Sequence, residues 1–113
     1  MQSLPSRNTR CRFGVAVRDV TPPADIYARW WGATPHEQAT GIHRPLMASV
    51  AVFAPLDGDG PHQVLVALDQ CSFQNFEDER ALRAAIRERA GVEDANLLLN
   101  LSHSHASANT NSA

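Results

Sequence analysis

The sequence predicts an α/β fold, in which a mixed sheet combines a β-hairpin with one right-handed βαβ unit. Residues 46–54 and 63–68 are apolar and β-branched, and they flank the turn sequence Asp57-Gly-Asp-Gly, which is typical of a hairpin. A helical pattern over about residues 75–91 then precedes a short apolar run at residues 97–101. A strand, a helix and a second strand in this order are expected to give parallel strands joined by a right-handed crossover.

The helix is the most strongly marked element. Asn75 is a good N-cap, and the three acidic residues that soon follow it suit the positive end of the helix dipole. Gly91 is a typical stop signal. Leu82, Ala85 and Ile86 have helical spacing, so we expect them to form the apolar face of the helix.

The N-terminal part is less regular. Residues 1–12 are expected to form a flexible leader, and the alternation from Phe13 to Val17 predicts a strand that ends before the Pro22-Pro23 pair. Residues 24–45 form a long irregular segment, of a length that is usually functional when it is ordered. Its aromatic side chains either plug the edge of the core or line a pocket: Tyr27, Trp30 and Trp31.

Composition excludes several classes of function. The chain has 113 residues, of which 43% are apolar, so it suits one modest globular core rather than a disordered segment. With 12 acidic residues against 10 lysines and arginines, it lacks the basic footprint of a nucleic-acid-binding protein. No apolar run approaches the ~20 residues of a transmembrane helix, and no signal peptide is visible, so we expect a cytoplasmic chain with free thiols at Cys11 and Cys71.

A pair of histidines carries the strongest chemical signal. His103 and His105 follow the apolar strand at residues 97–101. In an extended segment they face one side with Cα atoms ~6.5–7 Å apart, which lets both imidazoles converge on one zinc ion. Asp69 follows the strand at residues 63–68 and is expected at the same sheet edge, where α/β folds bind their ligands.

Two histidines do not complete a catalytic zinc site, which takes ~three protein ligands and a water. Asp69 is expected to orient an imidazole or to cap a turn. His43 directly precedes a strand and is expected to line the pocket or to stabilise a turn. Cys71 is expected to be a small buried apolar residue rather than a nucleophile. The internal candidates for a further ligand are His36, His43, His62, Asp69 and Cys71.

Four stretches in order resemble one family. They are GVAVRDVTPP at residues 14–23, TGIHRPLMASVAVF at 40–53, VLVALDQC at 64–71 and NLLLNLSHSHASA at 96–108. The order and spacing are similar to the start of the catalytic domain of the neutral/alkaline non-lysosomal ceramidases. Ser-His-Ser-His stands here in place of the family's Thr-His-Thr-His, and Ala-Ser-Ala replaces its Ser-Gly-Pro-like continuation.

The resemblance implies a zinc-dependent hydrolase that cleaves ceramide, an N-acyl lipid amide, into sphingosine and a fatty acid. It implies that His103 is a zinc ligand and that His105 lies in the active site beside the substrate. Residues 13–113 would be the N-terminal portion of a larger α/β catalytic domain, with the remaining ligands beyond Ala113, so that the chain alone would be inactive. Members of the family are often secreted or membrane-associated.

Two other interpretations stay open. The first is a different metal-dependent amidohydrolase that uses both His103 and His105 as ligands. Such barrels usually carry the motif on their first strand, whereas several predicted strands precede it here. The second is an inactive truncated module in which the histidines are incidental. The sequence predicts no oligomeric state.

Overall fold

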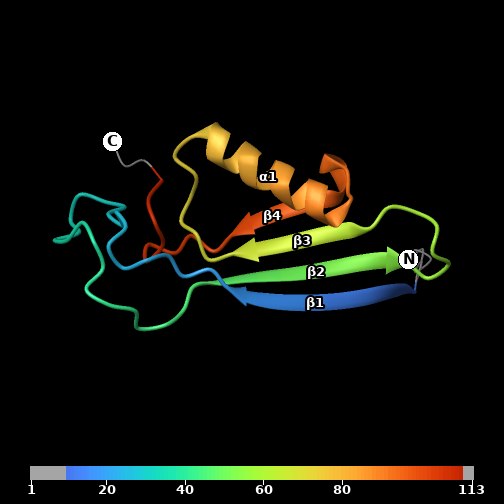
Figure 1. The fold of residues 1–113 in the computed structure, drawn as a ribbon, viewed down its shortest axis with the longest axis horizontal. Helices are drawn as coiled ribbons and strands as arrows, with labels where there is room; N and C mark the ends of the chain where they lie inside the picture. Colours follow the sequence, from blue (N-terminus) through green and yellow to red (C-terminus); the bar gives the residue numbers. More distant parts are fainter. Residues whose placement is uncertain (1–9, 111–113) are drawn as a thin grey trace, which may run out of the picture.

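The computed structural model describes residues 10–110, and within them a four-stranded mixed sheet carries one helix on one face (Figure 1). This confirms the predicted fold class. The strands lie in the order β1-β2-β3-β4, and only β3 and β4 are parallel. The elements are β1 (Cys11–Asp19), β2 (Met47–Pro55), β3 (Gln63–Leu68), α1 (Phe76–Ala90), a 3-10 turn (Asp94–Asn96) and β4 (Leu97–Leu101).

The predicted hairpin is formed by β2 and β3, which pair antiparallel with Val50 opposite Val66. Gly58 in the connecting turn has a φ of 83°, a conformation that glycine adopts without steric cost. β2 begins and ends one residue later than predicted. β1 begins at Cys11, so the last two residues of the predicted leader belong to the strand, whereas residues 1–9 lie outside the described residues.

The helix begins and ends where the capping signals predict. The Asn75 side chain accepts a hydrogen bond from the Asp78 N–H at 2.8 Å, and Gly91 ends α1 with a φ of 64°. Ile86 packs against the buried cluster, and Leu82 lies beside it over the sheet. Ala85, predicted to share this face, is exposed, so the apolar stripe is narrower than the sequence pattern indicated.

The core lies between α1 and one face of the sheet. Val64, Val66, Val92 and Leu97 are its buried residues, and α1 packs over them on the β3–β4 side (Figure 1). Side chains alternate along each strand, so the residues next to this core in the strands point to the opposite face, which no helix of residues 10–110 covers. Large apolar side chains are exposed there: Phe13, Val15, Val17, Phe53, Leu65 and Leu98.

Two segments meet beyond the carboxyl ends of β3 and β4. The loop between β1 and β2 lies against the segment that follows β4 (Figure 1). The Asn109 N–H donates to the Tyr27 carbonyl at 2.8 Å, and the Trp30 indole N–H donates to the Ser107 carbonyl at 2.7 Å. These bonds order the long irregular loop over one end of the sheet. Among the described residues, no helix is long and apolar enough to cross a membrane.

Candidate metal centre

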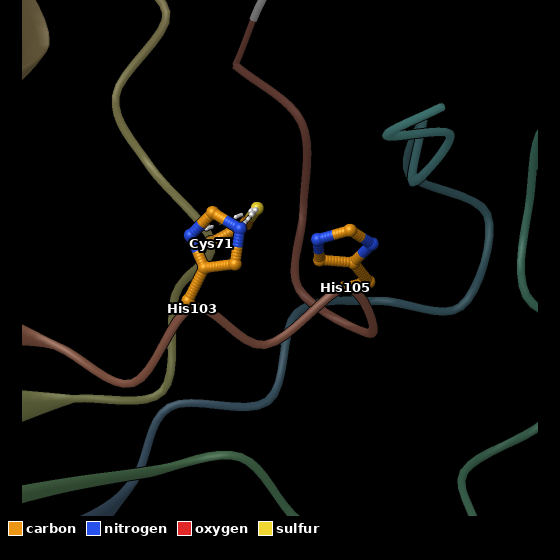
Figure 2. A group of neighbouring side chains, drawn as sticks. All are labelled: Cys71, His103 and His105. Atoms are coloured by element: carbon orange, nitrogen blue, oxygen red, sulfur yellow. Dashed lines mark hydrogen bonds between the residues drawn. The ribbon is translucent and has the colours of Figure 1, made fainter. Parts of the chain in front are cut away.

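Three side chains with metal-binding atoms converge at this end of the sheet: Cys71, His103 and His105 (Figure 2). One ligand atom from each lies within 4.8 Å of the others, which is close enough to bind a metal ion. Cys71 comes from the loop after β3, and both histidines come from the segment after β4. Because β3 and β4 are parallel neighbours, their carboxyl ends bring these two segments to the same edge.

Cys71 is held in place by a serine from the other segment. Cys71 is 5% exposed, and its backbone N–H donates to the Ser107 hydroxyl at 3.0 Å. Ser107 is fully buried, and its hydroxyl in turn donates to the Ser104 carbonyl at 2.9 Å. One hydroxyl group therefore joins the segment after β3 to the loop that carries both histidines.

His103 has a backbone conformation that is uncommon for a residue other than glycine. Its φ is 59°, in the left-handed region, where such residues concentrate at functional sites. The segment after Leu101 is therefore not a continuing strand, and the predicted route to convergence is wrong. The two imidazole rings nevertheless lie side by side, with centroids 5.1 Å apart (Figure 2).

The thiol and the imidazole of His103 are already in contact. The Cys71 Sγ lies 3.9 Å from both Nδ1 and Nε2 of His103. Burial raises the pKa of the Cys71 thiol, and a hydrogen bond with Ser72 opposes this rise. The protein alone therefore favours the neutral thiol, whereas a coordinated metal ion favours the thiolate.

His105 connects the cluster to a cavity. Its ring lies edge-on to Trp31, with centroids 6.3 Å apart. It also lines a cavity of about 450 Å³ under the β1–β2 loop, together with His36 and His43. The sequence placed His43 in the pocket or in a turn, and the structure puts it in the wall of the same cavity as His105.

The structure places Asp69 outside the cluster. Its carboxylate accepts a hydrogen bond from the Met47 N–H at 2.9 Å, and its own N–H donates to the Met47 carbonyl at 2.9 Å. Asp69 thus joins the end of β3 to the start of β2, and no contact with an imidazole is present among the described residues. His62 precedes β3 at the opposite end of the sheet and is exposed.

Cys71 is the one of the five internal candidates for a further ligand that the structure brings to the two histidines. It was expected to be buried, and it is, but its sulfur faces His103. Its position just beyond the carboxyl end of β3 was the signal that could have found it, because the histidines follow the parallel neighbour of β3.

Comparison with known proteins finds no family model, no curated protein and no solved structure that matches this chain. The resemblance to the neutral ceramidases therefore stays a prediction.

Proposed function

We propose that this chain provides the zinc site of a hydrolase that cleaves linear amide bonds in N-acyl lipids, with ceramide as the substrate class that the resemblance suggests. The observation that carries the proposal is the convergence of Cys71, His103 and His105 within 4.8 Å at the ligand-binding edge of the sheet. Three protein donors with one position left for water are the usual equipment of a catalytic zinc site.

The donor set suits zinc. Imidazole nitrogen and thiolate sulfur are both common zinc ligands, and hard cations such as magnesium prefer oxygen. Tetrahedral zinc requires about 3.4–3.6 Å between ligand atoms when Zn–N is about 2.1 Å and Zn–S about 2.3 Å. The contacts of 3.9 Å from the thiol to His103 are near this spacing, and the three donor atoms lie within 4.8 Å of one another. Because the sulfur is equally far from both ring nitrogens, the imidazole would have to turn to aim one nitrogen at an ion held by Cys71.

Each of these residues has a distinct role in this proposal. Zinc, when bound, polarises a carbonyl group and lowers the pKa of water. His103 and Cys71 hold the ion, and Ser107 fixes the backbone of Cys71. The cavity whose wall includes His105 would bind the amide substrate beside these donors.

Two roles for His105 follow from its position, as a third metal ligand or as a group that handles a proton. Its place within 4.8 Å of the other two donors supports a third ligand. Its exposure and its place in the cavity wall support the part that the resemblance implies, in which its imidazole holds or moves a proton beside the substrate. His43 in the same wall is proposed to line the substrate pocket.

Zinc content tests the site directly. The purified chain, dialysed against zinc and then against buffer, is expected to retain one equivalent by atomic absorption. His103→Ala should lose it, and Cys71→Ser should weaken zinc affinity at least tenfold, whereas His62→Ala, an exposed histidine far from the cluster, should behave as the unmodified protein. Retention of one equivalent by His103→Ala would show that the site is misassigned.

Two further measurements separate the remaining possibilities. Cobalt in place of zinc gives a sulfur-to-metal charge-transfer absorption only if Cys71 is a ligand. His105→Ala should lose the metal if His105 is a ligand, and should keep the metal but lose turnover if it handles a proton. Release of sphingosine from N-acylsphingosine, abolished by a chelator and restored by zinc, tests the reaction. Bound zinc without turnover of any N-acyl amide by the full-length protein would contradict the hydrolase proposal.

A further inference from the structure

We propose, on the basis of the proposed hydrolase function, that the cavity beside His105 binds a carboxylate, so that the N-acyl amide substrate, in place of the neutral ceramide that the resemblance suggests, carries a carboxylate on its amine part, as in an N-acyl amino acid. The cavity measures about 450 Å³, which is within the range of small-molecule sites. Its wall includes His105, so a ligand in it lies beside the metal cluster.

The charge of the cavity wall points to an anion. Arg44 is the one charged side chain among the described residues that line it, and these include no aspartate or glutamate to pair with it. The chain as a whole carries a net charge of −2, so this basic wall is not a general property of its surface. A concave site lined by one sign of charge concentrates ligands of the opposite sign.

Arg44 is available for a ligand. Three other arginines of the described residues pair with carboxylates: Arg29 with Glu37, Arg83 with Asp94 and Arg87 with Glu93. Arg44 is exposed and makes no ion pair or side-chain hydrogen bond within residues 10–110. Arg18, Arg80 and Arg89 share this lack of a partner, but of these four arginines Arg44 is the one that lines the cavity. A guanidinium group presents a planar fork of N–H donors that matches a carboxylate in two parallel hydrogen bonds.

The rest of the wall suits the acyl part of such a substrate. Ile26, Ile42 and Leu46 contribute apolar surface beside the histidines and Arg44. Binding pockets of this kind combine a mostly apolar lining with a few polar groups that fix orientation. Arg44, the two isoleucines and His105 line one cavity, so a carboxylate, an acyl chain and the amide that joins them would share it with His105.

The test compares two probes that differ by one charge. Binding of N-acetylglycine and of the neutral N-acetylglycinamide is measured by NMR chemical-shift titration on metal-free protein, so that coordination of the carboxylate by zinc does not contribute. We expect the carboxylate to bind at least tenfold more tightly, and Arg44→Gln to remove the difference. Arg44→Lys should keep part of it, because the charge remains without the planar fork.

Arg80→Gln is the matched control, because Arg80 is an exposed arginine on α1 that does not line this cavity. It should leave the preference for the carboxylate unchanged. Equal binding of the two probes, or a preference that survives Arg44→Gln, would overturn the proposal. If the zinc-loaded protein hydrolyses neutral N-acylsphingosine with a KM that Arg44→Gln leaves unchanged, the carboxylate assignment is wrong while the proposed reaction stands. If the protein binds no zinc but still prefers the carboxylate probe through Arg44, the carboxylate assignment stands while the proposed hydrolase is wrong.

Discussion

Two regions of the molecule are stabilised in different ways. The apolar body, formed by Val64, Val66, Val92 and Leu97, is held by burial under α1. The carboxyl edge, formed by residues 69–72 and 102–109, contains the candidate metal centre and is held by hydrogen bonds. The bonds from Cys71 to Ser107, from Trp30 to Ser107 and from Asn109 to Arg29 join residues 36 to 80 positions apart. Changes to the body should therefore affect global stability, whereas changes to the edge should affect the metal site first.

The largest effect is expected in the apolar body. Leu97→Ala should lower the free energy of unfolding by about 3 kcal/mol, because it removes a side chain that is 6% exposed and leaves a cavity. Urea denaturation measures the loss. Leu98→Ala, one residue along and 58% exposed on the uncovered face, should change stability by about 0.5 kcal/mol or less. Equal losses in the two variants would show that the uncovered face is buried in solution.

At the carboxyl edge, Ser107→Ala should cost about 2 kcal/mol, because it leaves the Cys71 N–H buried without an acceptor. It should also weaken zinc binding by about tenfold or more, as loss of a group that orients a ligand commonly does. Ser102→Ala is the control, since this serine is exposed. If Ser107→Ala lowers stability with no change in zinc affinity, the serine stabilises the fold without positioning Cys71.

A smaller effect is expected for the hydrogen bond that joins the β1–β2 loop to the segment after β4. Trp30→Phe keeps an aromatic ring but removes the indole donor to the Ser107 carbonyl, at a cost of about 1 kcal/mol. Trp31→Phe should have less effect, because Trp31 is 60% exposed. Limited proteolysis of the β1–β2 loop reports the loosening. Equal protection of the two variants would contradict the part assigned to Trp30.

The smallest effect concerns the pH dependence of a surface bond at the end of β1. Asp19 accepts hydrogen bonds from the hydroxyl and the backbone N–H of Thr21, and these lower the pKa of its carboxyl. A lowered pKa in the folded state stabilises the fold above the unfolded-state pKa of about 3.9, and this contribution is lost as the pH falls through the folded-state pKa. Asp19→Asn should therefore lose less stability than the unmodified protein on acidification from pH 5 to pH 3. Identical urea midpoints of the two proteins across this range would contradict the prediction.

The fold could be predicted because its signals are local. The apolar, β-branched runs that form β2 and β3, the Asn75 cap and the Gly91 stop each act within a few residues, and each is present in the structure. The boundary of β1 was predicted two residues late, because polar residues such as Arg12 satisfy the pairing pattern of an edge strand as well as apolar ones do.

The sequence by itself determined the mixed sheet, the helix and the placement of His103 and His105 beyond the carboxyl end of β4. Only the tertiary structure decided that Cys71 joins them and that the Asp69 carboxylate accepts a hydrogen bond from the Met47 N–H instead of contacting an imidazole. The reason is physical: strand and helix signals repeat along neighbouring residues, whereas the site depends on a buried serine hydroxyl that bonds across 36 positions and on one left-handed histidine. Neither leaves a periodic trace in the sequence.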